Sequence, residues 1–353
     1  MKRCLRPLVV FYILLAQVST EAAEQDEYYD AHTHLTNYIQ EGLTARQYLE
    51  IVGDRVGRSV LFGIPLQMQW SHRVTGDVAP GYYLDADNPL YYYSFNDASI
   101  AEQYRGLSRR QQSRLEPMIT GFNVADMYAA DHIRRVLQTY PGVFTGIGEF
   151  TIHKEFVSAK VSGDVASLID PAVDRIFDFT AESGLVAIMH NDIQMPFVKT
   201  KAKRFFFKQA VALLKRHPDS TIIWAHTGLG RIVQPVKGHL AMLEEILSDP
   251  GLDHVYFDIS WGEVAKYVVA TPESARLTAE LLEKYPDRFL MGSDNVAPPT
   301  AEASYAVFEQ YRPLWDLLSE ETSRKVRKEN FARLFDAAAR KVREWEKANP
   351  APK

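Results

Sequence analysis

The chain alternates short apolar segments with segments of helical periodicity, and this alternation limits the folds that it can adopt. Eight apolar runs have the length of buried strands, and they cover residues 28–34, 59–64, 117–122, 143–149, 185–189, 221–225, 255–259 and 289–293. Apolar residues recur at helical spacing between these runs, in 44–52, 99–110, 129–140, 171–183, 204–216 and 240–247. Strands that alternate with helices predict a parallel sheet with helices on its faces.

Eight such units predict an α/β fold, specifically a (β/α)8 TIM barrel with further helices at its C-terminal end. A doubly wound open sheet is the alternative. A chain of 353 residues is long enough for one barrel of this kind. Residues 65–97 form a long loop after the second strand and are rich in aromatic residues. Long loops without regular structure are usually functional, so we interpret this segment as a lid over a site rather than an insertion packed on the rim.

Polar residues follow the apolar runs at the points where the strands are expected to end. These residues are His32, His34, Glu149, His190, His226 and Asp294. In barrels of this kind, the catalytic groups lie at the C-terminal ends of the strands. The sequence therefore predicts that these six side chains meet at one end of the barrel.

The pair His32 and His34 is separated by a single residue, Thr33. Alternate side chains of a strand share one face, so both imidazoles are expected to point the same way. Two ring nitrogens at this spacing can bind one cation. A surface pair of histidines is the alternative, and the histidines that end later strands favour the metal.

Five motifs and the C-terminal tail resemble a known group of enzymes. The motifs DAHTHL, GIGEF, AIMHND, IIWAHTGLGR and LMGSDN resemble the amidohydrolase superfamily of metal-dependent hydrolases, most closely its amidohydrolase-related branch. The tail at 328–335 is similar to that branch's closing helix. The resemblance implies that His32, His34, His190 and Asp294 bind the metal, and that Asp294 also accepts a proton from the attacking water. His226 is implied to be either a further metal ligand or a catalytic acid and base.

Glu149 departs from the pattern of many two-metal members, which carry a carboxylated lysine at the end of the fourth strand. A glutamate there is similar to the TatD-type branch, in which it bridges two metals. The alternative is a buried carboxylate behind the ligands, so the number of ions stays open at one or two. Lys154 lies five residues later and is expected to be too far along the loop to replace the lysine.

Three imidazoles and a carboxylate suit Zn, and also Mn, Fe or Co, better than Mg or Ca. A metal-activated water indicates hydrolysis of a small ester, lactone, amide or related bond. The alternatives are a metal-dependent decarboxylase or lyase of a carboxylated substrate, and a binding protein that uses its metal without turnover.

Other polar residues carry less weight. Asp258 could line the site or cap a helix. The basic residues at 199–204 are expected to begin a solvated helix rather than to bind an acidic substrate. Six further histidines do not end a predicted strand, and we interpret them as structural or surface residues: His72, His132, His153, His217, His239 and His254.

The N-terminus has the pattern of a secretory signal peptide over residues 1–22, which leaves 23–353 as a single metal-dependent hydrolase barrel domain. Basic residues precede an apolar run at 8–16 that is too short to span a bilayer. The segment carries Lys2, Arg3, Arg6 and Glu21, a net charge of +2, so cleavage changes the formal charge from −5 to −7. We therefore expect a secreted or periplasmic protein with a small-molecule substrate, without a nucleic-acid partner or stable membrane insertion.

Overall fold

The computed structural model describes residues 27–37, 42–63, 77, 95–154, 166–194 and 205–351. Three predicted features lie wholly or mostly outside these residues. They are the signal peptide at 1–22, most of the loop at 65–97, and the basic residues at 199–204. His72 lies outside them as well.

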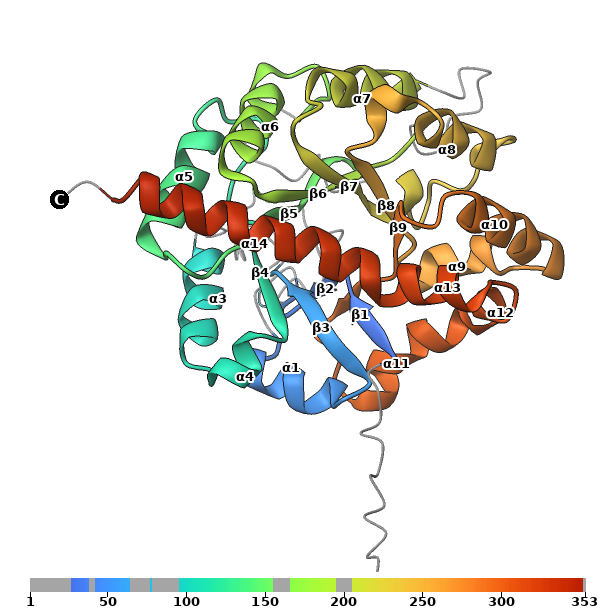
Figure 1. Cartoon of the computed structure of the whole chain (residues 1–353), viewed down its shortest axis with the longest axis horizontal. Coiled ribbons are helices and arrows are strands. Elements are labelled where there is room, and N and C mark those ends of the chain that lie inside the picture. Colours follow the sequence, from blue (N-terminus) through green and yellow to red (C-terminus); the bar gives the residue numbers. More distant parts are fainter. Residues whose placement is uncertain are drawn as a thin grey trace, which may run out of the picture.

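Eight strands form one parallel sheet in which neighbours follow the order of the chain. The strands are β1 (Tyr28–Asp30), β3 (Val56–Leu61), β4 (Leu115–Ile119), β5 (Gly146–His153), β6 (Val186–Asn191), β7 (Thr221–Trp224), β8 (Val255–Asp258) and β9 (Phe289–Leu290). A doubly wound sheet would reverse this order part-way, so the alternative fold is excluded. The predicted TIM-barrel-like α/β fold is confirmed, with the sheet curled inside a ring of helices (Figure 1).

Two short strands connect the first and last strands of the sheet. β2 (Thr33–His34) follows β1, and β10 (Asn295–Val296) follows β9. They pair in parallel, with Thr33 opposite Asn295 and His34 opposite Val296. The amide of Ala31 also donates a hydrogen bond of 3.0 Å to the carbonyl of Met291. These contacts bring the first and last strands of the sheet together at the rim of the barrel.

The helices surround the sheet, and their ends carry the expected signals. They are α1 (Ala45–Val52), α3 (Phe95–Arg105), α4 (Arg109–Gln112), α5 (Ala129–Thr139), α6 (Pro171–Ser183), α7 (Phe205–Arg216), α8 (His239–Leu247), α9 (Gly262–Val268), α10 (Pro272–Lys284), α11 (Ala301–Gln310), α12 (Arg312–Trp315), α13 (Glu320–Arg324) and α14 (Asn330–Ala348). The side chain of Asp170 caps α6 and Gly184 ends it in a left-handed conformation. Among the described residues, no helix combines the length and apolar character that crossing a membrane requires.

Several element boundaries differ from the prediction. β5 continues to His153, so Glu149 lies within the strand rather than at its end, and His153 ends a strand after all. The predicted helix at 99–110 is divided into α3 and α4, because Ser108 begins a new helix with its own capping box. α3 begins at Phe95, so the last residues assigned to the loop at 65–97 are helical.

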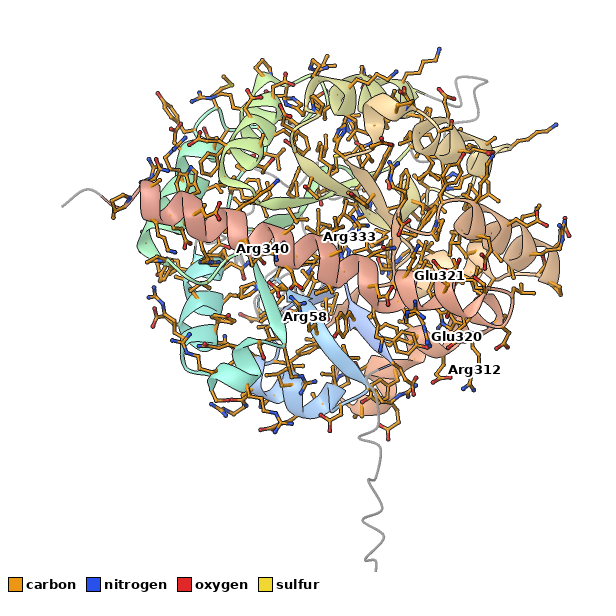
Figure 2. The ribbon with its side chains drawn as sticks, in the orientation of Figure 1. Arg58, Arg312, Glu320, Glu321, Arg333 and Arg340 are labelled. Carbon is orange, nitrogen blue, oxygen red and sulfur yellow. The ribbon has the colours of Figure 1, made fainter. Side chains whose placement is uncertain are left out.

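One end of the barrel is closed by α14, which lies across the strands in Figure 1. Phe331 and Phe335 of this helix join a buried cluster with residues that point into the barrel, such as Val60 and Val186. Arg58 of β3, labelled in Figure 2, fixes the helix from the side. Its guanidinium lies 2.8 Å from Asp336 and also contacts Glu116. The predicted closing helix therefore forms the floor of the barrel.

Candidate metal centre

The six predicted site residues meet at the end of the barrel opposite α14, and all are buried. His32, His34, Glu149 and His190 come from β1, β2, β5 and β6 or from residues beside them. His226 lies in the turn η2 (Ala225–Gly228) after β7, and Asp294 lies between β9 and β10. The prediction that these side chains share one end of the barrel is correct.

The two carboxylates lie between the imidazoles. Oδ1 of Asp294 is 3.3 Å from Nε2 of His32 and 3.2 Å from Nε2 of His34. Oε1 of Glu149 is 2.6 Å from Nδ1 of His190 and 3.5 Å from Nε2 of His226. Each carboxylate therefore contacts two histidines.

Glu149 also reaches the first pair of histidines, and this places it between both pairs. Its Oε2 is 3.8 Å from Nε2 of His34, and its Oε1 is 4.0 Å from Nε2 of His32. Two groups of potential ligands therefore share this carboxylate, one with His32 and His34, the other with His190 and His226, and the atoms of each group lie within 4.8 Å of one another. Glu149 therefore belongs to both groups.

Each histidine is oriented by a second polar group on its outer side. Nδ1 of His34 is 3.1 Å from the carbonyl of Gly63, so this nitrogen is a donor and the other ring nitrogen, Nε2, faces the centre. Nδ1 of His32 is 3.1 Å from Asp258, and Nδ1 of His226 is 2.8 Å from the hydroxyl of Ser260. Outer partners of this kind fix the orientation of histidines that bind metals.

Two of the inward nitrogens have no hydrogen-bond partner among the described residues. They are Nε2 of His32 and Nε2 of His226, and both atoms are buried. A buried polar atom without a partner is costly, and native structures contain few of them. A cation would satisfy both nitrogens, so the donor set of imidazoles and carboxylates fits a transition metal.

Asp258 was the residue that sequence reasoning undervalued. It does not cap a helix, because its carboxylate accepts a 2.9 Å hydrogen bond from the amide of His226 and contacts His32 and Ser260. Burial would raise the pKa of Asp258, but the charges of His32 and His226 hold it far below its usual range. Its place at the end of β8 was the signal available in the sequence.

The backbone holds two of the central residues in unusual conformations. His226 has a φ of 56° and Asp294 a φ of 50°, both in the left-handed region that costs residues with a side chain about 1–3 kcal/mol. Gly148, next to Glu149, has a φ of 110°, and a Cβ there would lie 2.1 Å from the carbonyl of Ile188. Such strain concentrates at functional sites, where the surrounding structure maintains it.

The charges at the centre support one another. Burial would raise the pKa of Asp294, but the neighbouring charges of His32 and His226 lower it to about 2. Burial likewise opposes protonation of His226, and the carboxylates of Asp258 and Asp294 outweigh this effect and raise its pKa to about 10. Glu149 is also ionised, because Lys154 and His190 lower its pKa despite burial. Without an ion, the carboxylates of the centre are therefore balanced by its own cationic side chains.

One wall of the centre carries two basic side chains around an indole ring. Lys154 was expected to lie too far along the loop, yet its Nζ is 3.4 Å from Oε1 of Glu149, because β5 carries the chain onward to this point. The same Nζ lies 5.5 Å from the ring centre of Trp261, and the guanidinium carbon of Arg231 lies 5.7 Å from it. The ring of Trp261 is in turn 5.1 Å from that of His226.

Three further described histidines lie outside the centre, as predicted. His153 stacks on Phe206 at 3.7 Å between ring centres, and His217 is 2.7 Å from Asp174 on the helical layer. His254 lies 3.1 Å from the carbonyl of Leu214. These contacts are structural.

A family model described as Amidohydrolase matches residues 29–337. The chain belongs to the amidohydrolase family. Membership supports an enzymatic role that depends on a metal, in agreement with the ligand clusters at the end of the barrel. No curated protein matches the sequence.

Solved structures similar to this amidohydrolase share its fold. An amidohydrolase from Burkholderia multivorans with bound zinc is 14% identical, with a TM-score of 0.52 over 88% of this chain and 99% of that one. The 2,6-dihydroxybenzoate decarboxylase from Rhizobium is 12% identical, with a TM-score of 0.51 over 88% and 99% of the two chains. A protein named amidohydrolase II is 14% identical, with a TM-score of 0.52 over the same shares. At these identities the likeness concerns the fold.

Proposed function

We propose that this amidohydrolase is an exported hydrolase that uses a metal-activated water to cleave a small ester, lactone, amide or related bond. The observation that carries the proposal is the pair of buried, unpartnered Nε2 atoms of His32 and His226, which face two carboxylates. A protein without an ion here would bury these atoms at a cost in stability. The signal-peptide pattern of residues 1–22 supports export.

We assign His32, His34 and Asp294 to one ion and His190 and His226 to a second, with Glu149 between them. The shared position of Glu149 in both ligand clusters supports two ions rather than one. Zinc suits this mixture of nitrogen and oxygen ligands best, and manganese, iron or cobalt could replace it.

The remaining chemistry falls to side chains already in place. A divalent ion bound at the centre would lower the pKa of a water molecule and polarise the bond to be cleaved. The carboxylate of Asp294, whose pKa is about 2, is ionised at neutral pH and can accept a proton. The alternative role of His226 is acid and base rather than ligand: a metal-free Nε2, 3.7 Å from Oδ2 of Asp294, is within reach of the same proton and can pass it to the leaving group.

A decarboxylase or lyase of a carboxylated substrate is the second candidate, and one observation favours it. Lys154 and Arg231 both lie within 6 Å of the ring centre of Trp261, beside His226. Two cations at the wall of the centre could hold a carboxylate, and the indole could hold a planar body. Export favours the hydrolase, because degradation steps of this kind usually accompany cytoplasmic metabolism.

The test of the proposal is elemental analysis of the purified protein combined with an activity screen. The screen covers esters, lactones, amides, phosphoesters and aromatic carboxylates. We expect about two transition-metal ions per chain, and hydrolysis that is lost with a chelator and restored by zinc. Release of carbon dioxide from an aromatic carboxylate, without hydrolysis of any ester, lactone or amide, would select the second candidate.

Replacing His32 and His34 together by Ala should abolish metal binding at their position and lower the melting temperature, because an ion held only by the folded state stabilises it. Replacing His217 and His254 by Ala provides the control, since both lie outside the centre. Full metal occupancy in the first double variant would show that the site has been assigned wrongly.

A further inference from the structure

His190 presents a different ring nitrogen to the metal centre than the other histidines do. The other three face the two carboxylates of the centre with Nε2, whereas the nitrogen of His190 that lies 2.6 Å from Glu149 is Nδ1. Nε2 of His190 lies instead 3.1 Å from Oδ1 of Asp192. We propose that Asp192 is a positioning residue, which holds the ring of His190 so that its ion is bound through Nδ1.

This role of Asp192 rests on the proposed function, since it requires an ion at the centre with His190 among its ligands. A histidine that binds a metal is neutral, and a neutral imidazole carries one proton. Only one of its nitrogens can then be a ligand, and the other donates a hydrogen bond. When Nε2–H donates to Asp192, the lone pair of Nδ1 is left for an ion beside Glu149.

Both contacts of the ring require the same orientation. Half a turn of the imidazole would exchange Nδ1 with Cδ2 and Nε2 with Cε1, and both carboxylates would then face carbon atoms. The three residues are buried, because His190 and Asp192 are each 1% exposed and Glu149 is 5% exposed. Loss of a hydrogen bond is costly in such surroundings, so the two contacts together select one orientation of the ring.

Backbone hydrogen bonds hold Asp192 in place. The residue directly follows β6, in which alternate residues share a face, so its side chain lies on the same side as that of His190. The amide of Asp192 donates a 2.7 Å hydrogen bond to the carbonyl of His153, and the amide of Ile193 donates one of 2.9 Å to the carbonyl of Gly228. The segment is therefore fixed both to β5 and to the turn after β7. An anionic partner held in this way also makes an imidazole a stronger ligand.

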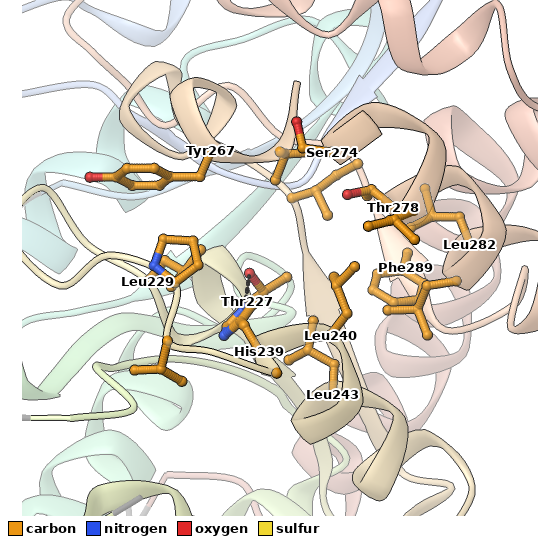
Figure 3. A pocket seen from close by; sticks show the side chains of 17 residues that line it. Thr227, Leu229, His239, Leu240, Leu243, Tyr267, Ser274, Thr278, Leu282 and Phe289 are labelled. Carbon is orange, nitrogen blue, oxygen red and sulfur yellow. Dashed lines mark hydrogen bonds between the residues drawn. The ribbon is translucent and has the colours of Figure 1, made fainter. Parts of the chain in front are cut away.

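The pair of His190 and Asp192 is separate from an apolar cavity of about 420 Å³ between β7–β9 and α8–α10 (Figure 3). Thr227 and Leu229, in and beside the turn after β7, line this cavity, and among the described residues around it neither His190 nor Asp192 is found. A change at Asp192 should therefore leave the cavity as it is, so its effect can be assigned to the ring of His190.

The first test measures zinc affinity on the full chain by competition with a chelator. Asp192→Ala removes the acceptor and should weaken the binding of one zinc ion about 10- to 100-fold, the usual cost of losing such a partner. Asp192→Asn keeps an oxygen acceptor without the charge, so its loss should be smaller. Unchanged zinc affinity in Asp192→Ala would overturn the role of Asp192 alone, whereas a wild type that binds no zinc would refute the proposed function and this role with it.

Asp97→Ala is the matched control. Asp97 is as buried as Asp192, and its carboxylate accepts hydrogen bonds from the amides of Thr120 and Gly121. The control should lower the melting temperature and leave the zinc affinity of the folded chain unchanged. An equal loss of zinc affinity in Asp97→Ala and Asp192→Ala would indicate general destabilisation and contradict the role of Asp192.

The second test observes the ring directly and needs no change at Asp192. Correlations between ring protons and nitrogens in the NMR spectrum of isotopically labelled, zinc-loaded protein distinguish a histidine that binds zinc through Nδ1 from one that binds it through Nε2. The signal of His190, identified by its absence from His190→Gln, should show zinc on Nδ1 and the proton on Nε2. Zinc on Nε2 would refute the proposal even if both Asp192 variants fail to fold.

Discussion

The two ends of the barrel are built from the same strands and have opposite chemistry. At the closed end, Phe331 and Phe335 of α14 fill the floor of the barrel with apolar side chains. At the open end, histidines and carboxylates are buried against one another, and two nitrogens there have no hydrogen-bond partner in the described part of the chain. Burial at the closed end stabilises the fold, whereas burial of polar groups at the open end costs stability that a bound ion would return.

Because of this difference, we expect that the chemistry of the open end and the stability of the closed end can be changed independently. Changes at the open end should alter the chemistry more than the fold, and changes at the closed end should do the reverse. Each of the following predictions either tests that separation or refines it.

The largest effect is expected for Asp294→Asn at the open end. Asn keeps the shape and one oxygen but is not a base, so turnover should fall about 10²- to 10⁴-fold. Metal content, measured by elemental analysis, should be largely retained, and the melting temperature should change little. A variant that kept both its metal and near-wild-type hydrolysis would remove Asp294 as the base and make His226 the next residue to test.

Phe335→Ala tests the closed end. Phe335 is fully buried, and removing a ring of this kind typically costs about 3–5 kcal/mol of unfolding free energy. Denaturant unfolding should show this loss, while the number of ions per folded chain stays the same. Loss of metal from the folded variant would mean that the two ends are coupled. Leu317→Ala is an exposed control that should cost little.

Asp97 should make stability depend on pH. Its carboxylate is buried and accepts hydrogen bonds of 2.8 and 3.1 Å from the amides of Thr120 and Gly121, at the open end of β4. Burial raises its pKa from 3.8 to about 7. The unfolded chain therefore releases this proton at lower pH than the folded chain does, so its contribution to stability is full below pH 4 and lost as the pH rises to 7.

Asp97→Asn removes this titration. The unfolding free energy of the wild type should fall relative to that of the variant between pH 4 and pH 7, by up to ~4 kcal/mol. Denaturant unfolding of both proteins at pH 5, 6 and 7.5 provides the measurement. A constant difference across this range would show that Asp97 does not titrate there.

Glu149→Ala refines the description of the open end by testing the number of ions there. If its carboxylate lies between two ions, metal content should fall from about two to about one per chain. Glu346→Ala is a matched control on α14, away from the centre. Two ions in the Glu149 variant would remove this residue from the ligand set.

The sequence was sufficient for the parts of the structure that follow local periodicity. Alternating strands and helices predicted the barrel, and the strand ends predicted which six side chains meet. It was insufficient where a residue's role depends on distant partners. Asp258 contacts His32 across 226 positions of the chain, and no local pattern distinguishes that contact from a helix cap. The contact of Lys154 with Glu149 was not predicted, because the polar end of β5 does not continue the apolar run that marks the strand.

The pairing of β2 with β10 has a consequence for the order of events in folding. The amide of Asp294 donates a 2.7 Å hydrogen bond to the carbonyl of His32, so the first and last residues of the centre are fixed to each other. A chain still being synthesised holds His32 and His34 long before Asp294 exists, and closing so long a loop is among the slower steps of folding. Tight binding of an ion would then appear only once the ring of strands is complete. The onset of tight ion binding would therefore mark the formation of the contact between His32 and Asp294.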